Sequence, residues 1–262
     1  MWLACRHHVN EIVLETNYKC IFGPSSSPDN PVFVDFRDNV WDTLDTKGPY
    51  KVLNINSRQL KSRKAEVLEF YTDILTIENS EGVLPRDDYR ETAELMMILL
   101  DATPPRGVRI YRPHGLHRAR WMAMIIYEGK RYTFSDQLNL DSVTVENLHR
   151  FCLFNALYYC PAWLSAPKGV DAAVNDLQFW KDKHHYAKIY EDLAQSALKA
   201  FDRHFWYLTE ENVVLALFSE KVTNQEKTSL AKQLLKCDKM TSVTAAGQPT
   251  FPNLNMSTKL KI

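Results

Sequence analysis

Two histidines and two arginines crowd a short stretch directly before a strongly apolar segment that ends at Tyr127. They are His114, His117, Arg118 and Arg120. If this segment is a helix, its N-terminus carries a partial positive charge that favours anions, so cations there need nearby carboxylates or a bound phosphate. In the alternative interpretation the arginines reach solvent or pair with acids of neighbouring helices.

Apolar side chains recur at helical spacing through this stretch and predict a largely buried helix. One face holds Leu116, Ala119, Ala123 and Ile126, and a second holds Trp121, Met124 and Ile125. Pro113 keeps the preceding residue out of the helix, and Gly129 marks its expected end.

Cys5 and His8 have the C-x-x-H spacing that could place a thiolate and an imidazole on one metal ion. A closed zinc site needs four ligands, and no second pair follows at finger spacing, with Cys20 alone the nearest addition. We therefore expect no metal site here. The chain also has no nucleophile-elbow serine, P-loop or dinucleotide fingerprint.

Composition restricts the class of protein. The 262 residues contain 32 basic and 32 acidic side chains, so any nucleic-acid surface must be a local patch. Five scattered cysteines are typical of reduced intracellular thiols. There is no apolar run long enough for a membrane span and no signal peptide, so we expect an intracellular protein of the nucleus or cytoplasm with no membrane partner.

The remaining pattern predicts about eight helices and at most two or three short strands. Helices are expected over 32–41, 57–78, 85–103, 141–163, 171–183, 186–206, 209–218 and from Thr223, where Thr223 and Glu226 form a capping box. Residues 1–17 are expected to form a buried strand or the end of a helix, and residues 130–140 an extended segment. We expect the basic cluster Lys61, Arg63 and Lys64 to form a solvated helix face. The alternative is that it contacts phosphate.

Two segments resemble hAT-like transposases, whose catalytic core is ribonuclease-H-like. Trp2-Leu-Ala-Cys-Arg-His-His-Val-Asn-Glu-Ile-Val-Leu14 resembles their C-x-x-H segment. His117-Arg-Ala-Arg-Trp-Met122 resembles the Arg-Trp pair that opens their all-helical insertion, in a divergent transposon-derived branch of invertebrates. The resemblance extends loosely through 86–90, 163–167 and 207–211, in family order, and so spans residues 2 to 220.

The resemblance implies a mainly α chain: a helical insertion-type domain with a remnant of a ribonuclease-H-like α/β core, truncated at its N-terminus. Residues 1–56 would be the remnant core and a loop, 57–240 the helical insertion and C-terminal helices, and 241–262 a disordered tail.

It also implies a chemistry that this chain lacks. Such transposases cut DNA with three acids that hold two divalent ions, magnesium in an intact member. The first two acids lie upstream of the C-x-x-H segment, and Glu211 or Glu210 is the candidate for the third, unless both are simply favourable first-turn charges of a helix. We therefore expect an inactive fragment that needs no cofactor.

DNA binding is the function that the resemblance leaves to this chain. The C-x-x-H and Arg-Trp elements lie near the transposon ends in the family, so the candidate DNA-contact residues are Cys5, His8, His114, His117, Arg120 and Trp121. Arg120 would pair with phosphate and Trp121 would stack on a flipped base, unless Trp121 is buried in the core. The alternative is a structural or protein-interaction helical module with an inherited self-association surface and no nucleic-acid role.

Overall fold

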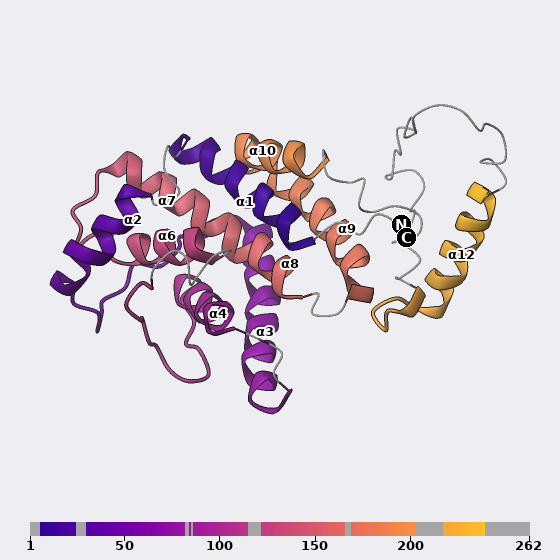
Figure 1. The fold of residues 1–262 in the computed structure, drawn as a ribbon, viewed down its shortest axis with the longest axis horizontal. Helices are drawn as coiled ribbons and strands as arrows, with labels where there is room; N and C mark the ends of the chain where they lie inside the picture. Colours follow the sequence, from indigo (N-terminus) through magenta and orange to yellow (C-terminus); the bar gives the residue numbers. More distant parts are fainter. Residues whose placement is uncertain are drawn as a thin grey trace.

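The computed structural model describes residues 6–24, 30–81, 84, 86–114, 122–165, 169–202 and 217–238, and these form helices joined by turns and loops (Figure 1). No strand occurs among them, so the mainly α prediction is confirmed at this level. The elements run in the order α1 (Arg6–Phe22), α2 (Pro31–Asp35), η1 (Phe36–Val40), η2 (Trp41–Thr43), α3 (Arg58–Glu81), α4 (Asp87–Leu99), α6 (Ala123–Thr133), α7 (Ser142–Phe154), η4 (Asn155–Tyr159), α8 (Cys160–Leu164), α9 (Gly169–Tyr186), α10 (Glu191–Asp202) and α12 (Asn224–Asp238).

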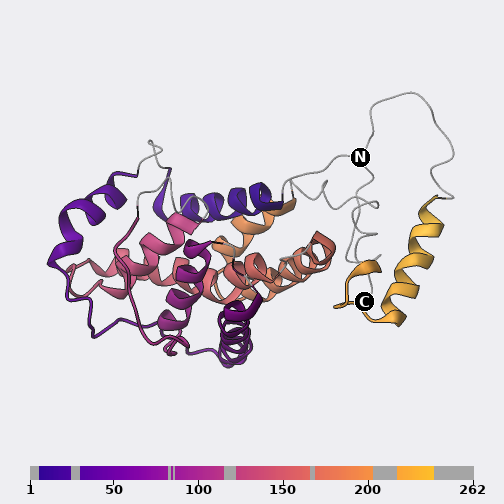
Figure 2. The ribbon, with the colours of Figure 1, turned by 60° about the horizontal axis from the view of Figure 1, so that its bottom comes forward.

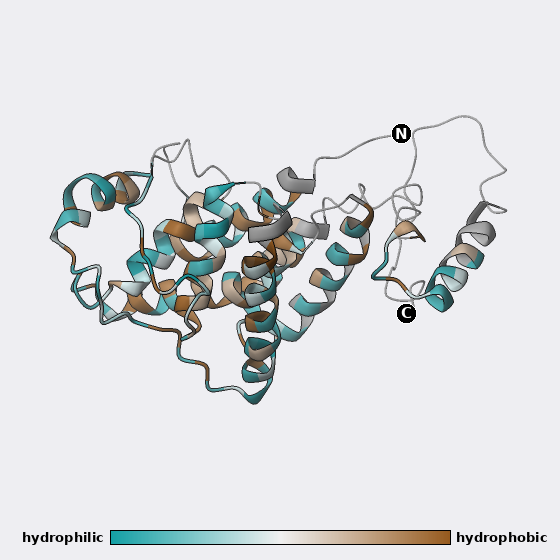
Figure 3. Cartoon of the chain, turned by 90° about the horizontal axis from the view of Figure 1, so that it is seen from below, coloured by the Kyte–Doolittle hydropathy of each residue, from teal (hydrophilic) through white to brown (hydrophobic). Residues whose placement is uncertain are grey.

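The continuous helical stretch α7, η4 and α8 lies at the centre of the fold. It packs against α1, α3, α4, α6 and α9, and every one of its residues from Phe151 to Leu164 is buried. Because the helices around it turn their apolar sides inward, one hydrophobic core runs from Val9 of α1 to Ala200 of α10. Figure 3 shows brown, hydrophobic residues concentrated between these helices and teal, hydrophilic ones on their outer faces.

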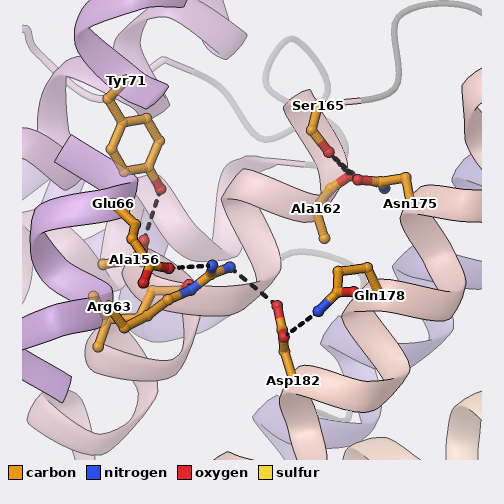
Figure 4. A network of polar contacts seen from close by, with 10 residues as sticks. Arg63, Glu66, Tyr71, Ala156, Ala162, Ser165, Asn175, Gln178 and Asp182 are labelled. Carbon is orange, nitrogen blue, oxygen red and sulfur yellow. Dashed lines mark hydrogen bonds and ion pairs between the residues drawn. The ribbon is translucent and has the colours of Figure 1, made fainter. Parts of the chain in front are cut away.

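Pro161 does not end this helix, because a π-helical turn precedes it. The Cys160 amide donates to the carbonyl of Asn155 instead of that of Ala156, and Pro161 has no N–H to offer Leu157. Two buried carbonyl oxygens are thereby freed. Side chains of α3 satisfy both, since the Tyr71 hydroxyl donates to Ala156 at 2.8 Å (Figure 4) and the Arg63 Nε donates to Leu157 at 3.1 Å.

Phosphate contact was the alternative for the basic cluster Lys61, Arg63 and Lys64, and the contacts of Arg63 argue against it at this residue. Its guanidinium pairs with Glu66 and with Asp182 of α9, each at 3.1 Å, and lies over the Tyr158 ring. The side chain thus joins three helices rather than facing solvent.

The N-terminal segment is helical, which decides between the strand and the helix end that the sequence left open. Residues 6–22 form α1, which packs lengthwise on α10 and also on α7, and Figure 2 shows α1 lying along the top of the helical body. Val9, Val13, Leu14 and Tyr18 recur at helical spacing on its buried side. The proposed ribonuclease-H-like remnant stays a prediction, and Met1 to Cys5 lie outside the described residues.

The described part of the apolar stretch after His114, from residue 122 onward, is helical, and α6 ends later than expected. Its first residue is Ala123, and it continues through Gly129 to Thr133. Gly129 lies inside α6 and has a packing role there. A Cβ placed at this position would meet the Leu95 side chain of α4 at 2.8 Å. The glycine lets α6 approach α4 closely, and this packing overrides the usual stop signal.

Residues 130–140 are not extended, which corrects a second strand prediction. Lys130 to Thr133 complete the last turn of α6, and Phe134 to Asn139 form consecutive turns. Asn139 adopts a positive φ of 50°, as an Asn in a turn can. Burial of Tyr132 and Phe134, rather than strand pairing, accounts for the aromatic run.

The other helix predictions are confirmed, with shifted ends. The 186–206 helix begins only at Glu191, because residues 187–189 form a turn after α9. Thr223 and Glu226 form the expected reciprocal capping box before α12, with the Thr223 amide donating to the glutamate at 2.8 Å. In Figures 1 and 2, α12 stands apart from the other helices.

Two further predictions lie mainly outside the described residues: the helix over 209–218, of which the structure describes only 217 and 218, and the 241–262 tail. Within the described ranges, no helix combines the length and apolarity that crossing a bilayer requires.

Candidate nucleic-acid interface

A long exposed segment, residues 102–114, joins α4 to α6, and we call it the arm. Figure 1 draws it as the long magenta loop between these two helices. It leaves α4 through a hydrogen bond from the Ala102 amide to the Met97 carbonyl, and it turns at Gly107, whose φ is +80°. The arm otherwise carries no regular structure, so its side chains are displayed without a helix or sheet of their own.

The far end of the arm is fixed to the body. The Arg112 guanidinium pairs with Asp42 and donates to the Arg37 carbonyl, while the buried Pro113 comes directly after it. The Tyr127 hydroxyl of α6 then donates to the His114 carbonyl at 2.6 Å. The arm is therefore held at both ends, and most residues between these ends are exposed.

The exposed middle of the arm is basic and partly aromatic. Arg106 and Arg109 are exposed, and Val108 and Tyr111 each retain 40 % of their accessible surface. No carboxylate in the described part of the chain forms an ion pair with Arg109. This combination of guanidinium groups and an exposed ring is typical of surfaces that contact phosphates and bases.

Charge is strongly segregated here although the whole chain is neutral. Between Ala102 and Tyr127 the sequence has five arginines and two histidines but no Asp or Glu. Sequence reasoning found only the second half of this segment. It missed Arg106, Arg109 and Arg112, whose spacing of three residues in a proline-flanked loop was the available signal.

The structure places few of the residues predicted from sequence. His114 is exposed and lies before α6, and because residues 115–121 lie outside the described residues, the predicted cluster of cations at a helix start stays a prediction. His8 lies in α1, but its side chain is not described. The remaining candidates, Cys5, His117, Arg120, Trp121, Glu210 and Glu211, lie outside the described residues.

Metal chemistry finds no support in the described ranges, where no three His, Cys, Asp or Glu side chains gather. Of the described cysteines, Cys20 is exposed, whereas Cys152 and Cys160 are buried in the core. Burial raises the pKa of both core thiols, so they are protonated and act as small apolar groups.

Buried charges elsewhere have structural partners. Lys130 of α6 is 1 % exposed and pairs with Glu91 of α4. Glu128 is fully buried, and it accepts hydrogen bonds from Arg131 at 2.6 Å and from the Tyr18 hydroxyl at 3.1 Å. Burial raises the pKa of Glu128 and lowers that of Lys130. Neither group opens onto the arm, and both join α6 to its neighbours.

Comparisons of the chain with protein-family models, with curated proteins and with solved structures find no match. The role of the arm is therefore inferred from the residues that it displays.

Proposed function

We propose that this chain is a transposase-derived protein without catalytic activity that binds DNA through the arm and the His/Arg/Trp segment after it. The observation that carries the proposal is the exposed, acid-free arm, which leads directly into residues 115–121. The resemblance to hAT-like transposases supports the same assignment from the sequence.

The arm suits a phosphate backbone. Arg106, Arg109 and Arg112 are three residues apart, so in an extended chain neighbouring arginines lie at most about 10 Å apart. One DNA strand advances about 3.4 Å along the helix axis per phosphate, so each arginine can reach a separate phosphate. The Tyr111 ring offers a stacking surface between them.

Arg112 has a structural role in the arm. Because it is paired with Asp42 and bound to the Arg37 carbonyl, it positions the arm. Arg106 and Arg109 are exposed, so they are the described residues to test for DNA contact, and Arg120 and Trp121 are the ones to test in the adjoining segment.

The test is fluorescence anisotropy with duplex and hairpin DNA over a range of salt concentrations. We expect salt-dependent binding that weakens about tenfold or more in the double variant Arg106→Gln, Arg109→Gln, with the slope of log K against log salt reduced by about 2. The matched control is Arg58→Gln, Lys61→Gln, which removes the same charge from the exposed side of α3.

Two results would overturn the proposal. Absence of DNA binding at low salt would favour the protein-interaction module. Light scattering would then measure whether the chain self-associates. Magnesium-dependent nicking that disappears in Glu211→Gln would show that the chain is an active nuclease.

A further inference from the structure

A second site lies away from the arm, in a cavity of about 500 Å³ where several elements meet. Its walls come from residues 54–57, the start of α3, Tyr132 at the end of α6, α7, and residues 189 and 190 before α10. The volume is in the range of small-molecule sites. No residue of the arm lines the cavity, so a ligand bound there would not depend on DNA binding.

The walls of the cavity are fixed by hydrogen bonds. The Tyr132 hydroxyl donates to the Val52 carbonyl at 3.2 Å, and the His149 Nε2 lies 3.1 Å from the Asn54 carbonyl oxygen. A carbonyl only accepts, so His149 carries its proton on Nε2, while its buried Nδ1 has no hydrogen-bond partner in the described structure. His149 therefore holds the 54–57 segment against α7.

The wall opposite is held by an ion pair. Arg150 donates to both carboxylate oxygens of Asp192, each at 2.5 Å, and its guanidinium lies 5.3 Å from the centre of the Tyr190 ring. Asp192 thereby neutralises the arginine. A positive group that enters the cavity beside Tyr190 does not meet an uncompensated charge.

Glu146 is the one ionisable acid that lines the cavity, and none of the described basic side chains pairs with it. Arg150 lies one helical turn beyond it on α7 but is directed to Asp192. The carboxylate acts on both tyrosines: after burial, it contributes to raising the pKa of Tyr132 and of Tyr190. Glu146 is itself exposed on α7, and its carboxylate lies close enough to both rings for its charge to act on them.

This arrangement selects among ligand classes. A phosphate or carboxylate would be repelled by Glu146, whereas a cation gains a charge-assisted hydrogen bond. The rings of Tyr132 and Tyr190 also attract organic cations. Leu60 and Val145 provide apolar surface for a short alkyl stem. The side chains of Asn54 and Ser57 can accept the remaining N–H groups.

We propose that this cavity binds an alkyl ammonium or guanidinium group, with Glu146 as its counter-charge and Tyr190 at its side. Such a group can belong to a free amine or to a Lys or Arg side chain of another protein. Glu146 is a binding residue in this assignment, and His149 a positioning residue.

The experiment is isothermal titration calorimetry of the whole chain with butylguanidinium, and with its uncharged counterpart pentanamide. We expect saturable binding of butylguanidinium that weakens about tenfold or more in Glu146→Gln, since a hydrogen bond to a charged group is lost. The matched control is Glu69→Gln, which removes an exposed glutamate from α3 and leaves the cavity unchanged.

A capped Gly-Arg-Gly peptide distinguishes the two sources. Tighter binding of the peptide than of butylguanidinium indicates a protein partner, and weaker binding indicates a free amine. Absence of saturable binding with both probes, equal affinity for pentanamide, or unchanged affinity in a folded Glu146→Gln variant would each overturn the assignment. Circular dichroism establishes that the variant is folded.

Discussion

The Nε of Arg63 donates to the carbonyl oxygen of Leu157 at 3.1 Å, the oxygen that Pro161 leaves without an amide partner. In an unbroken α-helix the residue at 161 would supply that hydrogen bond from its backbone. A side chain of α3 replaces it here. The central helix can therefore continue through a proline, and α3 is bound at the place where the backbone hydrogen bond is missing.

Arg63→Met should destabilise the fold by about 1–3 kcal/mol, because it leaves the Leu157 carbonyl without a donor. Asp182 also loses its cation, although it keeps a hydrogen bond from Gln178 at 2.8 Å. Urea denaturation measures the change. Lys61→Met, on the exposed face of the same helix, is the control and should stay within about 0.5 kcal/mol of wild type. Equal effects of the two variants would contradict the prediction.

Tyr71→Phe should cost a similar amount, about 1–3 kcal/mol, since the Ala156 carbonyl is buried and its hydrogen bond at 2.8 Å is lost. The ring itself is fully buried and stays in place, so the effect isolates the hydroxyl. Tyr111→Phe on the exposed arm is the matched control. A Tyr71→Phe variant as stable as wild type in thermal denaturation would mean that the π-helical turn does not need this donor.

Lys130→Met should destabilise by about 3–5 kcal/mol, because Glu91 would keep a buried charge without its partner. Adding Glu91→Leu removes that charge, so the double variant should recover most of the loss. Chemical denaturation of the two variants measures both steps. A double variant less stable than Lys130→Met alone would show that the ion pair is itself strongly stabilising.

Glu128 should make stability depend on pH. Its pKa is raised above the ordinary 4.5 by burial, so between 4.5 and the raised pKa the folded state binds more protons than the unfolded state. The contribution of Glu128 to stability must therefore fall as pH rises from about 4.5. The free energy of unfolding of wild type minus that of Glu128→Gln should fall over the same range in urea titrations. A flat or rising difference would contradict the raised pKa.

Local sequence patterns were enough to predict most helices, because an amphipathic helix is specified by residues three and four apart. The capping box of Thr223 and Glu226 is the clearest case, since both partners lie within one turn and need nothing else from the fold. The helix over 58–81 is predictable for the same reason from its apolar stripe.

Local patterns failed where a distant residue decides the outcome. Gly129 reads as a helix end but lies inside α6, because α4 needs its missing side chain for close packing. The aromatic run after Lys130 reads as a strand but is held as turns by burial in a helical core.

The candidate sites differ in the same way. The basic, acid-free character of 102–127 is contained in the sequence, because charge needs no folding to be counted. The anchoring of the arm by Asp42 and Tyr127, and the cavity around Glu146, depend on residues far apart in the chain. The sequence alone thus determined the helices and the local charge, while only the tertiary structure decided which side chains meet, because packing brings together residues that no local pattern relates.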